Sequence, residues 1–174
     1  MDIPVPSEQP VGSTGPGLRE PVHHVSRRAI GYWTTRAILD AVVVLGVGAG
    51  IAAASGFRGW WWPVLGVAAL LFVARILIMP RWRYRVHRWE VTDQALYTRS
   101  GWISIRWRIA PISRIQTVDS HRSFWERVFG LANVTATTAS AAGHIRIHGL
   151  DKAVAERLQS DLTITTAQTP GDAT

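Results

Sequence analysis

Two apolar stretches decide the fold of this chain: AILDAVVVLGVGAGIAAASG (Ala37–Gly56) and GWWWPVLGVAALLFVARILIM (Gly59–Met79). Each has about 20 residues, enough for a helix to cross a hydrocarbon core of about 30 Å. Only Phe57 and Arg58 separate them, so we expect an antiparallel membrane hairpin. Buried helices of a soluble protein are the alternative, which the length of both stretches and the one-sided charge around them disfavour.

Arginine placement predicts the orientation of this hairpin, because short cytoplasmic flanks retain Lys and Arg. Only Arg58 lies in the turn. The outer flanks carry Arg27, Arg28 and Arg36 before the first stretch, and Arg81, Arg83, Arg85 and Arg88 after the second. We therefore expect a multi-pass protein of a bacterial inner (plasma) membrane, with both termini in the cytoplasm.

Each apolar stretch contains one charged residue, Asp40 or Arg75. If the helices turn about Phe57 and Arg58, residues whose numbers sum to about 115 lie at equal depth. Asp40 and Arg75 meet that condition, and pairing across the hairpin would lower the cost of ionisable groups in the apolar layer. Alternatively, each side chain snorkels to the nearby interface. The residues alone favour neither interpretation.

Tryptophans and glycines add detail to the hairpin. We expect indoles to anchor it in both headgroup layers, with Trp60, Trp61 and Trp62 on the far side and Trp82 and Trp89 on the near side. Gly46 and Gly50 have GxxxG spacing, which permits close approach of two helix backbones. We favour packing of the first helix on the second over dimerisation of two copies.

Outside the hairpin, the chain leaves room for one small polar domain. We expect a disordered cytoplasmic tail over 1–28, the hairpin over 29–80, a cytoplasmic domain over 81–162 and a flexible tail over 163–174, because both ends lack large apolar residues. His23 and His24 are then solvated tail residues and not metal ligands. The absence of cysteine excludes disulfides and thiolate chemistry, and the formal charge of +7 suits an anionic membrane surface.

Beyond Pro80 the apolar period changes from helical to alternating, which indicates half-buried antiparallel strands. We expect strands over 83–91, 95–99, 102–109, 115–120, 133–139 and 144–148. The alternation is clearest in 102–109, where we expect the side chains of Ile103, Ile105, Trp107 and Ile109 to face the core. The strands therefore predict a meander with one buried face.

Two helices are expected within and after these strands. Phe124–Phe129 indicates a short helical turn that Ser123 caps and Gly130 ends. After Asp151, an expected N-cap, apolar residues recur at spacing four. These residues are Val154, Leu158 and Leu162. One apolar stripe of this kind can close the open end of a sandwich or barrel.

Two further segments carry a family resemblance: IAPISRIQTV (Ile109–Val118) and ERVFGLA (Glu126–Ala132). Together with the hairpin and the ending IHGL (Ile147–Leu150), they resemble the bacterial pleckstrin-homology-like (bacterial PH) membrane proteins of the YdbS type. The resemblance covers approximately Ala29 to Leu162. It implies a membrane α-helical hairpin plus a mainly-β PH-like sandwich or partly open barrel capped by a C-terminal α-helix, and it brings no established enzymatic activity. Ala110 and His121 depart from the residues common in that family.

Two non-enzymatic functions fit these residues. We favour a membrane-anchored interaction or assembly module that binds a membrane-protein partner, or another copy of itself, at the cytoplasmic face. Its candidate partner surface comprises Arg114, Gln116, Asp119 and His121. Alternatively, the domain recognises anionic lipid headgroups through a basic cluster comprising Arg81, Arg83, Arg85 and Arg88, with Arg106 and Arg108 adding charge. Arg114 is equally suited to holding its own loop, by pairing with Asp119, Glu126 or a backbone carbonyl.

Catalysis is disfavoured, and no cofactor or metal is expected. His121, Ser123 and Asp119 are superficially like a catalytic triad, but no nucleophile elbow accompanies them. His144 and His148 would stand about 13 Å apart on one strand face, which is too far to ligate one zinc ion. Nucleic-acid binding is also disfavoured, because the basic residues abut the membrane and the polar strand face lacks interleaved aromatic residues.

Overall fold

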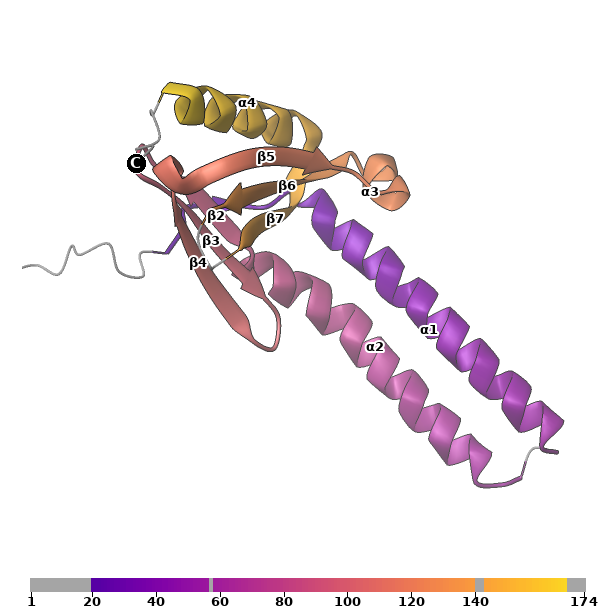
Figure 1. Cartoon of the computed structure of the whole chain (residues 1–174). Helices are drawn as coiled ribbons and strands as arrows, with labels where there is room; N and C mark the ends of the chain where they lie inside the picture. The colour runs from indigo at the N-terminus through magenta and orange to yellow at the C-terminus, as the bar shows by residue number, and fades with distance from the viewer. Residues whose placement is uncertain (1–19, 57, 140–142, 169–174) are drawn as a thin grey trace, which may run out of the picture.

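Two long helices project as a hairpin from a small β domain in the computed structural model, which describes residues 20–56, 58–139 and 143–168 (Figure 1). The helices are α1 (Arg28–Ala54) and α2 (Trp61–Val86). One antiparallel sheet has the order β1 (His23–His24), β2 (Arg88–Val91), β3 (Ala95–Gly101) and β4 (Ile105–Pro111). The other has the order β5 (Ile115–His121), β6 (Leu131–Thr138) and β7 (His144–Asp151). The connecting and final helical segments are η1 (Ile112–Arg114), α3 (Phe124–Val128) and α4 (Lys152–Gln168).

The main core lies between the two sheets and α4, which confirms the predicted PH-like sandwich with a C-terminal helical cap. Leu96 of β3 and Val134 of β6 are almost fully buried there. Leu158 and Leu162 of α4 are buried in the same cluster, as the spacing of four predicts. The predicted helical turn is also present, because Ser123 and Glu126 form a reciprocal capping box at the start of α3.

A second apolar cluster joins the base of the hairpin to the β domain. Val25, Ala29, Trp33 and Leu131 are buried together in it. The Ser26 N–H donates to the Gly149 carbonyl oxygen at 2.9 Å, and the Ser26 hydroxyl donates to the Asp151 carboxylate at 2.9 Å. At the other helix only His87 separates α2 from β2. The hairpin is therefore built into the domain without a flexible linker.

The N-terminal segment before the hairpin belongs to the sheet, so the expected tail over 1–28 is wrong for residues 20–28. His23 pairs with Trp89 and His24 with Arg88 across the β1–β2 ladder. Their rings contact Trp89 and Tyr84, with centroid distances of 5.2 and 5.4 Å. At the other end, α4 continues through residues 163–168 of the expected C-terminal tail. Residues 1–19 and 169–174 lie outside the described residues.

The expected strand over 83–91 is also wrong in its first half, because α2 passes through Pro80 and ends only at Val86. Arg83 and Arg85 occupy its last turn, where cations interact favourably with the helix dipole. Trp89 of β2 contacts both apolar clusters, so it is a packing residue and not the expected near-side anchor. The helix α2 therefore continues for about two turns beyond the end of its apolar run at Met79.

The expected inward face of the third strand is reversed. β4 pairs with β3 so that Ala110 lies opposite the buried Leu96, which turns the even-numbered residues toward the core. Ile105 and Ile109 are 43% and 40% exposed on the other face, and Ile103 in the preceding turn is 83% exposed. The strand also begins at Ile105, because residues 102–104 extend the turn. β4 therefore carries an exposed apolar stripe.

The two hairpin helices expose most of their apolar side chains. Only 17% of the best apolar window in α1 and 6% of that in α2 are buried, so the rest of the described chain does not bury these helices as a soluble core would. Gly48 makes the close approach to α2, beside Leu65. Gly46 and Gly50 have no neighbour within 4 Å of where a Cβ would be, so the expected role of this pair in packing α1 on α2 is wrong.

Candidate functional site

Two rows of mainly polar side chains face each other where the hairpin enters the β domain. Tyr32, Arg36 and Asp40 lie at spacing four on α1, and Arg75, Met79 and Arg83 do so on α2. Side chains four residues apart share one helix face. Residues of the two helices whose numbers sum to about 115 lie at equal depth in the hairpin. The two rows therefore match one to one, at three levels: Asp40 with Arg75, Arg36 with Met79, and Tyr32 with Arg83.

The deepest level is an ion pair. Arg75 Nη2 lies 3.1 Å from Asp40 Oδ2, and the two side chains are 39% and 44% exposed. The structure therefore brings these residues together, as the pairing hypothesis expected, in preference to snorkelling of each charge alone. Since their outer surfaces lie within the apolar part of the helices, mutual pairing compensates charges that lipid cannot solvate.

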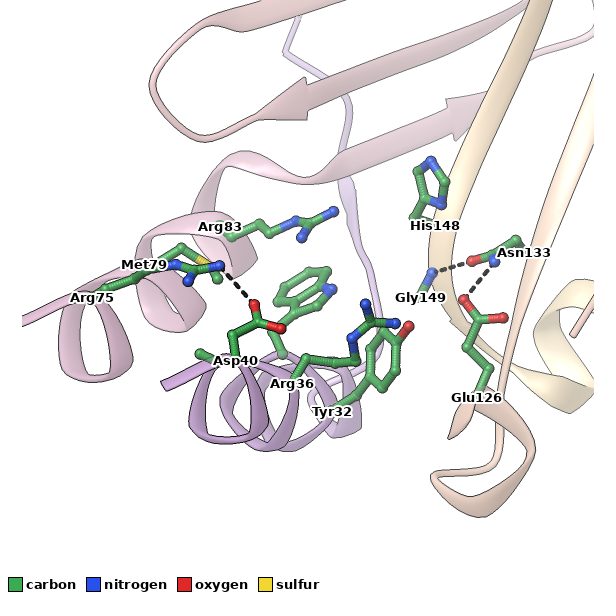
Figure 2. A pocket seen from close by; sticks show the side chains of 12 residues that line it. Tyr32, Arg36, Asp40, Arg75, Met79, Arg83, Glu126, Asn133, His148 and Gly149 are labelled. Carbon is green, nitrogen blue, oxygen red and sulfur yellow. Dashed lines mark hydrogen bonds and ion pairs between the residues drawn. The ribbon is translucent and has the colours of Figure 1, made fainter. Parts of the chain in front are cut away.

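A cavity of about 360 Å³ opens between these rows and the β domain (Figure 2). This volume lies within the range of about 300–1,000 Å³ typical of small-ligand sites. The helices contribute Tyr32, Trp33, Arg36, Ala37, Asp40, Arg75, Met79 and Arg83, and the β domain contributes Glu126, Asn133, His148 and Gly149. Figure 2 shows the guanidinium groups of Arg36 and Arg83 extending into the same space.

A buried hydrogen-bond network forms the domain wall of this cavity. The Asn133 amide donates to Glu126 Oε1 at 2.6 Å and accepts from the Gly149 N–H at 3.0 Å. The Ser123 N–H donates to the other Glu126 carboxylate oxygen at 2.8 Å. Burial raises the pKa of Glu126, but hydrogen bonds from Ser123 and Asn133 outweigh this effect and lower it. The carboxylate is therefore ionised and already bonded at both oxygens.

Arg83 is half-buried at the centre of the site. Its Cζ atom lies 4.5 Å from the centroid of the Trp33 ring, an arrangement that suits a cation–π interaction. Burial and, secondly, this arginine lower the pKa values of His87 and His148 from 6.5 to about 4. Both imidazoles are therefore neutral at neutral pH, and Arg83 supplies the positive charge.

A model of the family described as the bacterial PH domain matches residues 37–163. The chain belongs to the bacterial PH domain family. It is also 27% identical to the transmembrane protein YdbS of Bacillus subtilis (strain 168) over 148 residues, which cover 83% of this chain and 92% of that protein. No solved structure matches the chain significantly. The family, this relative and the two exposed apolar helices identify a membrane protein with a bacterial PH domain.

The expected basic cluster is divided in this bacterial PH domain. Arg81 and Arg85 are exposed, whereas Arg83 turns into the cavity and Arg88 pairs with Glu20 at 3.3 Å. Of the two additional residues, Arg106 is exposed and Arg108 donates to the His144 carbonyl oxygen. Four neighbouring arginines in the sequence therefore do not form one patch.

The residues of the expected partner surface lie along one edge of the bacterial PH domain. Arg114 ends η1, and Gln116, Asp119 and His121 are exposed along β5. Among the described residues, Arg114 makes no ion pair with Asp119 or Glu126, two of the partners expected if it held its own loop. The sequence interpretation predicted the helical turn α3 but did not include it in this surface, although Phe124 and Val128 are 64% and 63% exposed there.

The sequence interpretation also missed most of the cavity. The spacing of four in Tyr32, Arg36 and Asp40 and the equal-depth rule together contained the signal for its helical walls. Asn133 and His148 gave no comparable signal, because their positions depend on how the bacterial PH domain docks onto the hairpin. A strand pattern predicts which face a residue occupies and not which helix lies against it.

Proposed function

We propose that this protein recognises the phosphate of an anionic lipid headgroup in the cavity at the base of the hairpin. One observation carries the proposal: Arg36 and Arg83 extend into the cavity, and neither forms an ion pair with a carboxylate among the described residues. A guanidinium donates in a planar fork that matches phosphate oxygens. The sequence favoured assembly, but this geometry favours its alternative, lipid recognition.

The two carboxylates of the cavity do not cancel these cations. Asp40 is engaged by Arg75, and Glu126 accepts hydrogen bonds from Ser123 and Asn133. An anion placed between Arg36 and Arg83 would therefore meet positive charge at short range. Binding there would also remove part of the cost of leaving a half-buried arginine without a counter-ion.

The position of the cavity along the hairpin supports a lipid as the source of the phosphate. The level of Arg36 and Met79 coincides with the cytoplasmic end of the apolar runs. Asp40 and Arg75 lie one turn deeper, about 6 Å, and Arg83 lies one turn toward the domain. A phosphate beside Arg83 would thus lie in the headgroup layer, with acyl chains directed along the apolar helices.

The proposal assumes that the β domain lies in the cytoplasm of a multi-pass inner-membrane protein. The arginine distribution around the hairpin supports that orientation. Since the chain has no cysteine, a single Gly59→Cys variant can be labelled in intact cells with a membrane-impermeant maleimide. We expect labelling at position 59 and none for Asp93→Cys in the β2–β3 turn. The opposite pattern would place the domain outside.

Lipid retention tests the site directly. The chain is reconstituted in mixed phosphatidylglycerol and phosphatidylcholine, extracted in mild detergent, and examined by native mass spectrometry for retained lipid. We expect preferential retention of phosphatidylglycerol and about a tenfold weaker preference in Arg36→Gln, since about 1.4 kcal/mol corresponds to a factor of ten. Arg83→Gln should have a similar effect.

Arg85→Gln is the matched control, because it removes the same charge two residues away on the exposed side of α2. It should retain phosphatidylglycerol as the unmodified chain does. Equal losses in all three variants would indicate diffuse surface charge and reject the site. Unchanged retention in Arg36→Gln and Arg83→Gln would reject the proposal. The Arg36→Gln result is informative even if Arg83→Gln weakens the fold, because the Arg36 side chain is exposed.

Assembly is a second candidate function, and the exposed α3 side chains favour it. Phe124 and Val128 lie one turn apart, beside the polar surface of β5 that ends at His121. Aromatic and aliphatic centres with polar rims are common in protein interfaces. A photo-crosslinker at Val128 should then capture a membrane protein or a second copy of this chain. Adducts with lipid alone would reject this role, which involves binding and no catalysis.

A further inference from the structure

The turn between β3 and β4 carries apolar side chains that the fold leaves uncovered. Ile103 at its centre is 83% exposed, and Trp102 and Ile105 beside it are 39% and 43% exposed. Gly101 begins the turn with φ of +131°, and a side chain there would collide with the Ser104 carbonyl oxygen. The chain thus uses a glycine to form a turn that displays, and does not bury, its apolar residues.

This turn lies beside α2 at the cytoplasmic end of the membrane segment. The Trp82 indole N–H donates to the Trp102 carbonyl oxygen at 3.1 Å. Trp82 follows Met79, the last residue of the apolar run, by about 4.5 Å of helix rise. Figure 1 shows the β3–β4 turn pointing along α2 in the direction in which the hairpin leaves the domain.

Packing within the domain does not account for these apolar residues. A cavity of about 410 Å³ lies beneath the turn, lined by both polar and apolar residues that include Arg83, His87 and Arg106. On the outside, the exposed Leu77 and Ile78 of α2 continue the apolar surface toward the membrane centre. The uncovered turn therefore lies beside Trp82 of a helix whose own apolar side chains are exposed.

We propose that the β3–β4 turn inserts Trp102 and Ile103 into the cytoplasmic headgroup layer of the bilayer that the hairpin crosses. Indoles favour this layer, and an aliphatic side chain beside them gains by leaving water. Arg81 next to Trp82 and Arg106 next to Ile105 are exposed and suit the lipid phosphates of the same layer. With the two helices, the turn supplies a third membrane contact that fixes the tilt of the β domain.

A depth series along the apolar stripe tests this insertion. Single cysteines replace Ile103, Ile105 or Ile109 in the cysteine-free chain, and Asp93→Cys in the other hairpin turn is the control. Each variant is spin-labelled in phosphatidylcholine–phosphatidylglycerol vesicles, and label accessibility to oxygen and to a water-soluble nickel chelate is compared. Folding is checked by thermal unfolding, which should change little because these side chains are exposed.

We expect the label at Ile103 to favour oxygen at least fivefold more than the label at Asp93, with Ile105 intermediate. Ile109 lies about 13 Å beyond Ile105 along β4 and should match Asp93. An aqueous label at Ile103 would overturn the proposal. Shielding of Ile103 and Ile109 from both reagents would also overturn it, because a protein partner would then cover the whole stripe. The result is independent of the lipid-binding cavity, which Ile103 does not line.

Discussion

Acidification should destabilise the β domain through His87. This imidazole is only 4% exposed, its Nδ1 lies 2.8 Å from the Arg83 carbonyl oxygen, and its ring centroid lies 5.3 Å from that of Trp33. Burial, together with the Arg83 guanidinium and then His148, holds its pKa at about 4, against an ordinary value of 6.5. The folded state therefore favours the neutral ring, with Nδ1–H donating to the carbonyl.

The sign and the size of the effect follow from proton linkage. Between a pH of about 6.5 and about 4 the unfolded chain binds a proton that folded His87 excludes, so stability falls as the pH falls. A shift from 6.5 to about 4 removes about 2 kcal/mol between pH values of about 7 and about 5. His148, with a pKa also near 4, acts in the same direction, but its partial exposure reduces its contribution.

Guanidinium unfolding in detergent micelles at both pH values, followed by tryptophan fluorescence, measures this loss. His87→Asn retains a donor for the carbonyl but does not titrate, so its stability should depend less on pH. The matched control His121→Asn removes an exposed imidazole and should behave as the unmodified chain. A flat curve for the unmodified chain, or equal pH dependence in His87→Asn, would refute the reasoning.

Two further experiments test the polar contacts of the cavity. Asn133→Ala leaves Glu126 Oε1 and the Gly149 N–H without a buried partner and should cost about 2–4 kcal/mol in the same unfolding assay, whereas a loss below about 1 kcal/mol would contradict the network. Asp40→Asn and Arg75→Gln should each destabilise the hairpin, and combining them should cost about 1–3 kcal/mol less than the sum of the two. Additive losses would show that the ions do not stabilise one another.

The hairpin could be predicted almost completely from the sequence, because its determinants are local. Length, apolarity and arginine placement predicted two membrane helices, and counting from the turn correctly matched Asp40 with Arg75. The same numbering relation matches Tyr32 with Arg83 and Arg36 with Met79. The helical wall of the cavity could therefore be derived from the residue numbers, whereas the wall formed by the β domain could not.

Features that depend on the relation between layers could not be predicted. Alternation in β4 was clear, but the face that meets the core depends on the register of Ala110 with Leu96. A one-residue change in register exchanges the two faces of a strand. The end of α2 was misjudged for a related reason, since Arg83 remains helical while lying over Trp33, a residue about 50 positions away.

The β1–β2 ladder implies an order of biogenesis. β1 precedes the hairpin in the chain and β2 follows it, yet the two strands pair. During synthesis β1 must therefore wait for β2, and in a hairpin that crosses the membrane this requires α2 to return to the side from which α1 entered. A chain in which one helix fails to insert would separate the two strands by the bilayer and leave the edge of β2 unpaired, a state that invites aggregation. Completion of this sheet consequently requires that β1 and β2 lie on the same side of the membrane.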